Sequence, residues 1–198
     1  MGTNALRGRE NWQTNSGGKA VDAEKDFFSV FNEEFAMSEF RIQAKPNEFR
    51  NIYNTVNLSK EVLEQIYDPG RNWIHGFVPD YAIRNLKSEK TLYVEVKRQD
   101  GWVEGKEPSA GRGNAHERSN KYFTPGLLRL LREHGKLGND VLPFWVVFQG
   151  DIARDPKRVR EVTYWYAEYS AHFFMWIDST DSTSLIAHFN NKLKHLLL

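Results

Sequence analysis

The sequence feature that most restricts the fold is the stretch VLPFWVVFQ at residues 141–149. It is a nearly continuous apolar run in which β-branched and aromatic side chains predominate. Such a run is typical of a central strand that is buried on both of its faces. The chain is therefore expected to build a sheet that other elements cover from two sides.

The rest of the chain supplies helices and further strands for this sheet. The apolar spacing over residues 19–35 predicts a helix, and residues 78–84 and 91–98 alternate in the manner of a hairpin. The remaining predicted elements are a short helix after Ser59, a helix from Pro125 to near Gly135, a helix from Pro156, a strand over 173–177 and a closing helix through Leu185 and Leu196. This order predicts the α/β class, with a mixed β-sheet flanked by helices.

Length and composition favour a single folded domain over residues 1–198. A content of 40% hydrophobic residues argues against disorder, and no apolar run approaches the roughly 20 residues that a spanning helix needs. Residues 1–18 form a polar N-terminal arm without the apolar core of a signal peptide. We therefore expect a soluble protein of the bacterial cytoplasm.

The absence of cysteine limits the metals that the chain could bind. With no thiolate available, a metal must take carboxylate, carbonyl, water or histidine ligands, which favours a hard ion such as Mg²⁺. The formal net charge of +1 argues against a uniformly basic nucleic-acid binder. The charge is polarised, however, because residues 97–132 are rich in Lys and Arg whereas residues 22–39 are acidic.

The predicted hairpin brings three polar groups together. In the strand 91–98, apolar side chains occupy every second position and so share one face. Glu95 and Lys97 therefore lie together on the other face. If the hairpin is symmetric about the turn 85–90, Asp80 lies across from Glu95, and a divalent cation would relieve the repulsion between the two carboxylates. Two carboxylates on a hard cation, with an ammonium group beside them, suit phosphodiester hydrolysis. The alternative is that all three are ordinary solvent-facing residues.

A glycine-rich segment follows the hairpin directly. Its small residues let the backbone approach base edges closely, and its polar residues can read those edges through hydrogen bonds. The small residues are Gly111, Gly113 and Ala115, and the polar ones are Arg112, Asn114, Glu117 and Arg118. Without the hairpin beside it, the segment would equally fit a surface loop of mixed charge.

These motifs carry a family resemblance. PD at 79–80 with EVK at 95–97 resembles the PD-(D/E)xK nuclease core, and GNAHERS at 113–119 resembles the extended recognition motif of the EcoRI-like type II restriction endonucleases. The core motif is common to many nucleases. The longer runs at 97–119 and 142–163 are more specific, and they are most similar to the members of this family that cut CAATTG.

The resemblance implies a role for each matching residue. Asp80 and Glu95 would be Mg²⁺ ligands and Lys97 the catalytic lysine. Asn114, Glu117 and Arg118 would read the inner AATT, with Gly113 and Ala115 close to the bases, whereas Arg112 would read the outer C:G pair. EcoRI has isoleucine where this chain has His116, so His116 is not expected to be essential.

The implied activity is that of a type II site-specific deoxyribonuclease. A homodimer would cut double-stranded DNA at a palindromic site after its first C, leaving 5′ overhangs, with one active site in each subunit. Two alternatives remain open at this stage. A structure-specific repair nuclease would have no need of the readout segment, and a non-catalytic DNA-binding protein would have no need of the paired acids.

Overall fold

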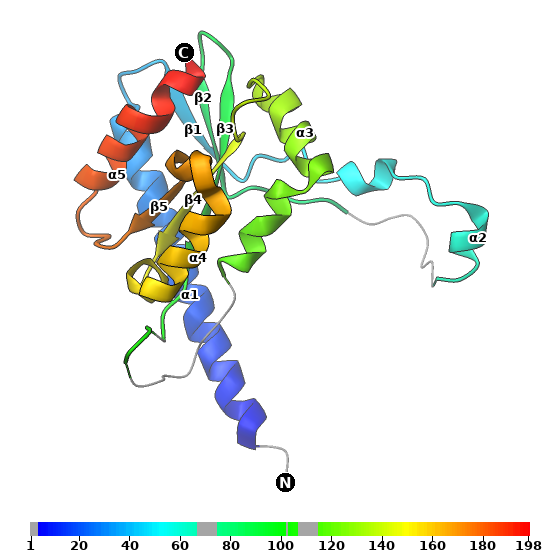
Figure 1. The fold of residues 1–198 in the computed structure, drawn as a ribbon, viewed down its shortest axis with the longest axis horizontal. Coiled ribbons are helices and arrows are strands. Elements are labelled where there is room, and N and C mark those ends of the chain that lie inside the picture. The colour runs from blue at the N-terminus through cyan, green and yellow to red at the C-terminus, as the bar shows by residue number, and fades with distance from the viewer. Residues whose placement is uncertain (1–3, 67–74, 102, 107–114) are drawn as a thin grey trace.

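The protein is built on one five-stranded mixed sheet. The computed structural model describes residues 4–66, 75–101, 103–106 and 115–198 (Figure 1). The strand order is β1-β2-β3-β4-β5, antiparallel between β1, β2 and β3 and parallel between β3, β4 and β5. The strands are β1 (Phe40–Ala44), β2 (Tyr81–Asn85), β3 (Thr91–Arg98), β4 (Phe144–Gln149) and β5 (Phe173–Trp176).

The apolar run at 141–149 forms the interior strand that its composition predicts. Every residue of β4 is buried, and the strand pairs with β3 on one side and with β5 on the other. Successive side chains of a strand point to opposite faces, so β4 contributes Trp145 and Val147 to one core and Phe144, Val146 and Phe148 to the other. The predicted mixed sheet with helices on both faces is confirmed.

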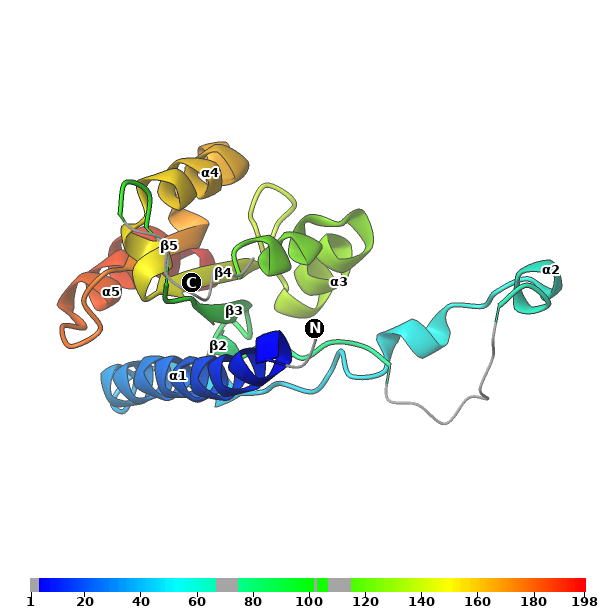
Figure 2. The same cartoon turned by 90° about the horizontal axis from the view of Figure 1, so that it is seen from below.

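Helices cover both faces of the sheet (Figure 2). One face packs against α1 (Asn4–Glu34) and against α5 (Thr183–His188) with the turns that follow it. The other packs against α3 (Pro125–Gly135) and α4 (Pro156–Tyr166). The remaining short helices are η1 (Ile52–Thr55), α2 (Lys60–Leu63), η2 (Glu117–Phe123), η3 (Asp151–Arg154), η4 (Ala167–His172), η5 (Phe189–Leu193) and η6 (Lys194–Leu197).

The spacing of aromatic residues explains how α1 docks on the sheet. Phe27, Phe31 and Phe35 recur every four residues and therefore lie on one stripe of the helix, where all three are buried. The rings of Phe27 and Phe31 meet Trp145 of β4 at centroid distances of 5.6 and 5.8 Å. This contact fixes the C-terminal part of α1 against the interior strand.

The structure differs from the sequence prediction at two places near the N-terminus. The predicted helix over 19–35 is confirmed, but α1 begins at Asn4, so the polar arm is helical from that residue on and projects from the body of the protein (Figure 1). Strand β1 was not predicted. It is an edge strand in which apolar Phe40 and Ile42 alternate with Arg41 and Gln43, a pattern that fits a half-buried strand but extends over only five residues.

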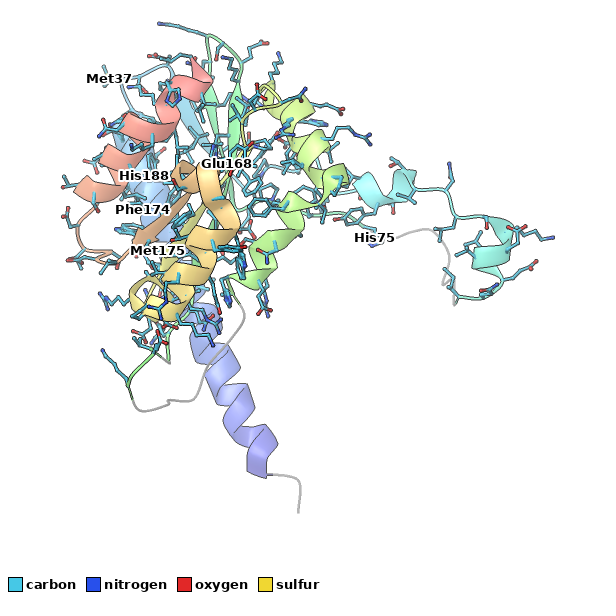
Figure 3. The ribbon with its side chains drawn as sticks, in the orientation of Figure 1. Met37, His75, Glu168, Phe174, Met175 and His188 are labelled. Carbon is cyan, nitrogen blue, oxygen red and sulfur yellow. The ribbon has the colours of Figure 1, made fainter. Side chains whose placement is uncertain are left out.

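A second projection carries α2 away from the sheet (Figure 1), whereas η1 packs against the core through Ile52 and Tyr53. Ser59 is the N-cap of α2 as predicted, with its side chain accepting a bond from the backbone N–H of Val62, although this α-helix ends at Leu63. Figure 3 shows His75 on this side of the molecule and His188 beside Phe174 on the other. None of the described helices is both long and apolar enough to cross a lipid bilayer.

Gly150, directly after β4, offers a test of this packing. Its φ of 84° and ψ of −155° fall in a region that is essentially restricted to glycine, and a Cβ there would lie 2.4 Å from Asp100 Oδ1. Gly150→Ala should lower the free energy of unfolding by about 1–3 kcal/mol, measured by urea denaturation. Gly126→Ala is the matched control, because a Cβ at Gly126 in α3 meets open space. Wild-type stability in Gly150→Ala would contradict this account.

Candidate active site

The β2–β3 hairpin places the predicted site residues. Tyr81 pairs with Val94, so Asp80, immediately before β2, falls opposite Glu95 one step further along the ladder. The register that the sequence predicts is therefore the observed one. The backbone N–H of Val96 donates to Asp80 Oδ2 at 2.9 Å, which ties the carboxylate to the partner strand.

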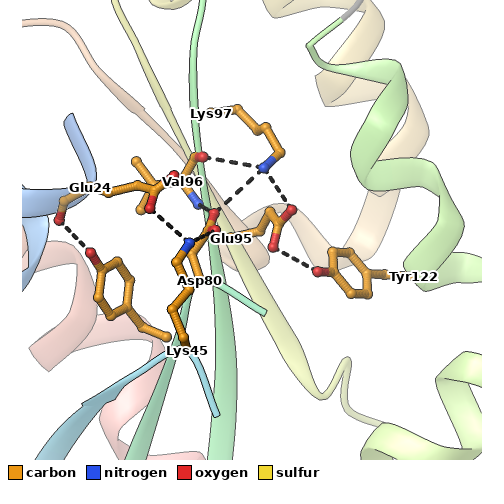
Figure 4. A network of polar contacts seen from close by, with 8 residues as sticks. Glu24, Lys45, Asp80, Glu95, Val96, Lys97 and Tyr122 are labelled. Atoms are coloured by element: carbon orange, nitrogen blue, oxygen red, sulfur yellow. Dashed lines mark hydrogen bonds and ion pairs between the residues drawn. The ribbon is translucent and has the colours of Figure 1, made fainter. Parts of the chain in front are cut away.

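The three polar groups meet on one face of the hairpin (Figure 4). Lys97 Nζ lies 2.6 Å from Glu95 Oε1 and 3.5 Å from Asp80 Oδ2. Asp80 and Glu95 are only 6% and 5% exposed, so both carboxylates depend on protein donors rather than on bulk water. The structure thus brings together the groups that the sequence analysis assigned to catalysis.

Tyr122 of η2 completes the surroundings of Glu95. Its hydroxyl donates to Glu95 Oε2 at 2.6 Å, so both oxygens of this carboxylate have a partner. Burial and the negative charge of Glu95 raise the pKa of Tyr122, and the hydroxyl therefore remains protonated as a donor. Tyr122 lies shortly after the motif at 113–119, and no local pattern in the sequence pointed to its contact with Glu95.

A second pair of charges lies on the other side of Asp80. Lys45 Nζ is 2.6 Å from Asp80 Oδ1 and 2.7 Å from Glu24 Oε2 of α1. Burial lowers the pKa of Lys45, but the hydrogen bonds that its ammonium group donates to Asp80 and Glu24 outweigh this effect, and the net result is a raised pKa. Sequence reasoning missed Lys45 and Glu24, because they lie far from the hairpin along the chain and no motif includes them.

The donor atoms of the site suit a hard cation. Within the described part of the chain, no cluster of three or more His, Cys, Asp or Glu residues could hold a metal ion. The site instead offers the carboxylates of Asp80 and Glu95, with the backbone carbonyl of Val96 within 3.3 Å of Lys97 Nζ. Carboxylate and carbonyl oxygens, completed by water, form the kind of ligand set that Mg²⁺ takes.

The segment expected to read DNA is described only from Ala115 onward. Arg112, Gly113 and Asn114 lie outside the described residues. The backbone N–H of Ala115 donates to Gln99 Oε1 at 3.1 Å, which ties this end of the segment to the residues just after β3. Glu117 and Arg118, in the first turn of η2, are exposed and accessible to a ligand in solution.

His116 has a packing role beside these residues. It is buried, and its ring stacks on Trp165 of α4 with a centroid distance of 5.3 Å. Burial and the nearby Arg158 lower the pKa of His116, so the ring is neutral at pH 7. The ring thus takes part in packing, and the expectation that His116 is not essential stays a prediction.

The fold and the site together define a nuclease of the PD-(D/E)xK class, with an acid before one strand and the Glu-x-Lys triplet on the next strand of a mixed sheet. The chain belongs to the family of type II restriction enzyme MunI, whose family model matches residues 1–198. Membership of this family makes the protein a type II restriction enzyme and sets aside the repair-nuclease and non-catalytic alternatives.

Two comparisons give the degree of similarity. The chain is 49% identical over 203 residues to the type II restriction enzyme MunI of Mycoplasma sp., and the match covers 100% of both sequences. It also matches the crystal structure of MunI restriction endonuclease in complex with cognate DNA, with a TM-score of 0.81 and 48% identity. That match covers 95% of this chain and 98% of the solved chain.

The bond between Tyr122 and Glu95 can be tested through stability. Tyr122→Phe should lower the free energy of unfolding in metal-free buffer by about 1–3 kcal/mol, because it leaves a buried carboxylate oxygen without its donor. The ring contacts with Phe77 and Phe144 do not involve the hydroxyl and should persist. Tyr164→Phe, at an 84% exposed position, is the matched control. Equal stability of the two variants in urea denaturation would mean that this bond contributes nothing.

Proposed function

We propose that this protein cleaves double-stranded DNA at the palindrome CAATTG, as a Mg²⁺-dependent homodimer that leaves 5′ overhangs. The observation that carries the proposal is the meeting of Asp80, Glu95 and Lys97 on one face of the hairpin. The solved structure of MunI with its cognate DNA supports DNA as the partner of this chain as well.

Asp80 and Glu95 would hold the cation, assisted by the Val96 carbonyl. When bound, Mg²⁺ would neutralise phosphate charge and acidify a water molecule. Lys97 would position the attacking water and stabilise the charge that develops on the phosphate, since its ammonium group lies beside both carboxylates. The Val96 N–H and the Tyr122 hydroxyl hold the two carboxylates in fixed orientations for this task.

The segment after β3 would read the DNA sequence. Arg112 would bond O6 and N7 of the outer guanine, whereas Asn114, Glu117 and Arg118 would read the inner AATT with Gly113 and Ala115 in close approach. The exposure of Glu117 and Arg118 at the start of η2 supports this assignment. Since η2 also carries Tyr122, the reading residues and the carboxylates belong to one connected part of the structure.

A homodimer would match the two-fold symmetry of the target. Each chain offers one hairpin site among its described residues, and cutting both strands of a palindrome requires two such sites related by a two-fold axis. One subunit would therefore serve each strand.

Asp80→Ala tests the assignment of the site. The variant should lose Mg²⁺-dependent cleavage of phage DNA while it still binds a CAATTG duplex in Ca²⁺, because the change deletes a cation ligand and no base contact. Sedimentation of that complex should give two chains per duplex. Near-normal cutting by the variant would refute the site, and one chain per duplex would refute the dimer.

Arg112→Ala tests the choice of the outer base pair. A bidentate arginine–guanine contact contributes about 1–3 kcal/mol of discrimination, so the variant should lose roughly 10- to 100-fold of its preference at the outer pair. Its preference for AATT should survive. The measurement is binding in Ca²⁺ to duplexes substituted singly at each position, at one salt concentration because phosphate contacts make the affinity salt-dependent.

Arg118→Ala is the matched control for this experiment. It removes the same charge from the same segment, but it should weaken discrimination among the inner bases instead. If Arg112→Ala weakens binding equally on every duplex, Arg112 is a phosphate contact and the outer pair is read by another residue.

A further inference from the structure

Lys45 is held beside Asp80 by its backbone as well as by its side chain. It directly follows β1, and its φ of 46° is in the left-handed region that side chains other than glycine rarely adopt. Its backbone N–H donates to the carbonyl oxygen of Asp80 at 2.9 Å, and its Nζ donates to Asp80 Oδ1 at 2.6 Å. A strained backbone that is retained beside a reactive carboxylate is a common mark of a functional position.

Glu24 competes with Asp80 for the same ammonium group (Figure 4). Its Oε2 lies 2.7 Å from Lys45 Nζ, and its side chain is 24% exposed against 9% for that of Asp80. The hydroxyl of Tyr81 donates to the backbone carbonyl of Glu24 at 2.7 Å, which fixes this turn of α1 against β2. Lys45 therefore has a second acidic partner whose place is set by the fold.

The contact with Lys45 bears directly on cation binding. Asp80 accepts from Lys45 at Oδ1 and from the Val96 N–H at Oδ2, so both of its oxygens are engaged by protein donors. An ammonium group at 2.6 Å from a carboxylate oxygen repels a cation that approaches the same carboxylate. A divalent ion must therefore displace the Lys45 ammonium group from Asp80, or bind despite the repulsion by its positive charge.

We propose that Lys45 is a positioning residue that competes with the divalent cation for Asp80, and that Glu24 draws its ammonium group away. Together the two residues set the concentration of Mg²⁺ that the site needs. This inference rests on the proposed function, because it takes Asp80 as a cation ligand.

The proposal requires opposite effects at the two positions. Loss of the Lys45 ammonium should lower the Mg²⁺ concentration for half-maximal cleavage roughly three- to tenfold, as expected for removal of one unit charge from a partly exposed site. Glu24→Gln should raise that concentration roughly two- to fivefold, since it removes a negative charge and leaves Asp80 as the remaining acidic partner of Lys45. If Lys45 and Glu24 acted only on the stability of the site, both variants would change the Mg²⁺ requirement in the same direction.

Lys45→Gly is the variant of choice. Glycine adopts the positive φ without strain, so this change removes the ammonium group while it keeps the backbone conformation and the N–H bond to Asp80. Lys45→Arg preserves the charge and should stay near the wild-type Mg²⁺ requirement. Thermal melting of each variant checks that it folds. If Lys45→Gly does not fold, an unchanged Mg²⁺ requirement in Glu24→Gln still overturns the inference.

Two measurements are needed. The first is the Mg²⁺ dependence of cleavage of a CAATTG duplex, and the second is Mn²⁺ binding to the DNA-free protein, followed by electron paramagnetic resonance. We expect tighter Mn²⁺ binding by Lys45→Gly and weaker binding by Glu24→Gln. If the wild-type protein shows no saturable Mn²⁺ binding without DNA, the cleavage measurement decides.

Shifts in the same direction, or no shift at all, would overturn the inference. Asp80→Ala, measured in parallel, separates this failure from that of the proposed function. If Asp80→Ala still cuts, the site assignment itself is wrong. Suppose instead that Asp80→Ala does not cut, and that the Mg²⁺ requirements of Lys45→Gly and Glu24→Gln do not shift in opposite directions. Only the competition between Lys45 and the cation is then refuted.

Discussion

The antiparallel pairing of β2 with β3 imposes the constraint on which the site depends, because it sets two nearly buried carboxylates side by side. Burying like charges is costly unless donors and counter-charges compensate them. The compensating groups come from three parts of the fold. Strand β3 supplies the Val96 N–H and Lys97. Lys45 directly follows β1, and Tyr122 belongs to η2. The charge balance of the hairpin thus depends on groups that β1 and η2 bring to it.

The interior strands give this arrangement its rigidity. Strand β3 pairs with β2 on one side and with β4 on the other, and its alternate residues enter two separate cores. Glu95 and Lys97 lie on the part of β3 that pairs with β4, directly beyond the segment that is hydrogen-bonded to both neighbouring strands. A site on such a scaffold keeps its geometry more closely than one that is built on loops. The exposed residues Glu117 and Arg118, in contrast, lie on a short helix at the surface, where contact with a ligand is possible.

The sequence predicts the parts of the structure that depend on local patterns. The period of two along β3 and the short turn before it are sufficient to place Asp80 opposite Glu95, and the apolar run of β4 is sufficient to predict a sheet covered on both faces. The network around Asp80 could not be predicted in this way. Glu24 and Lys45 meet Asp80 only because α1 and β1 dock against the hairpin, and that docking depends on long-range packing.

Helix η2 joins an exposed end to a buried end over a very short stretch of chain. Glu117 and Arg118 in its first turn are exposed, whereas Tyr122 near its end is buried with its hydroxyl on Glu95. The Tyr122 hydroxyl holds Glu95, and Lys97 contacts both Glu95 and Asp80, so the buried end of η2 takes part in the network around both acids. The charge balance of the site therefore depends on the placement of a short helix whose other end is open to solvent.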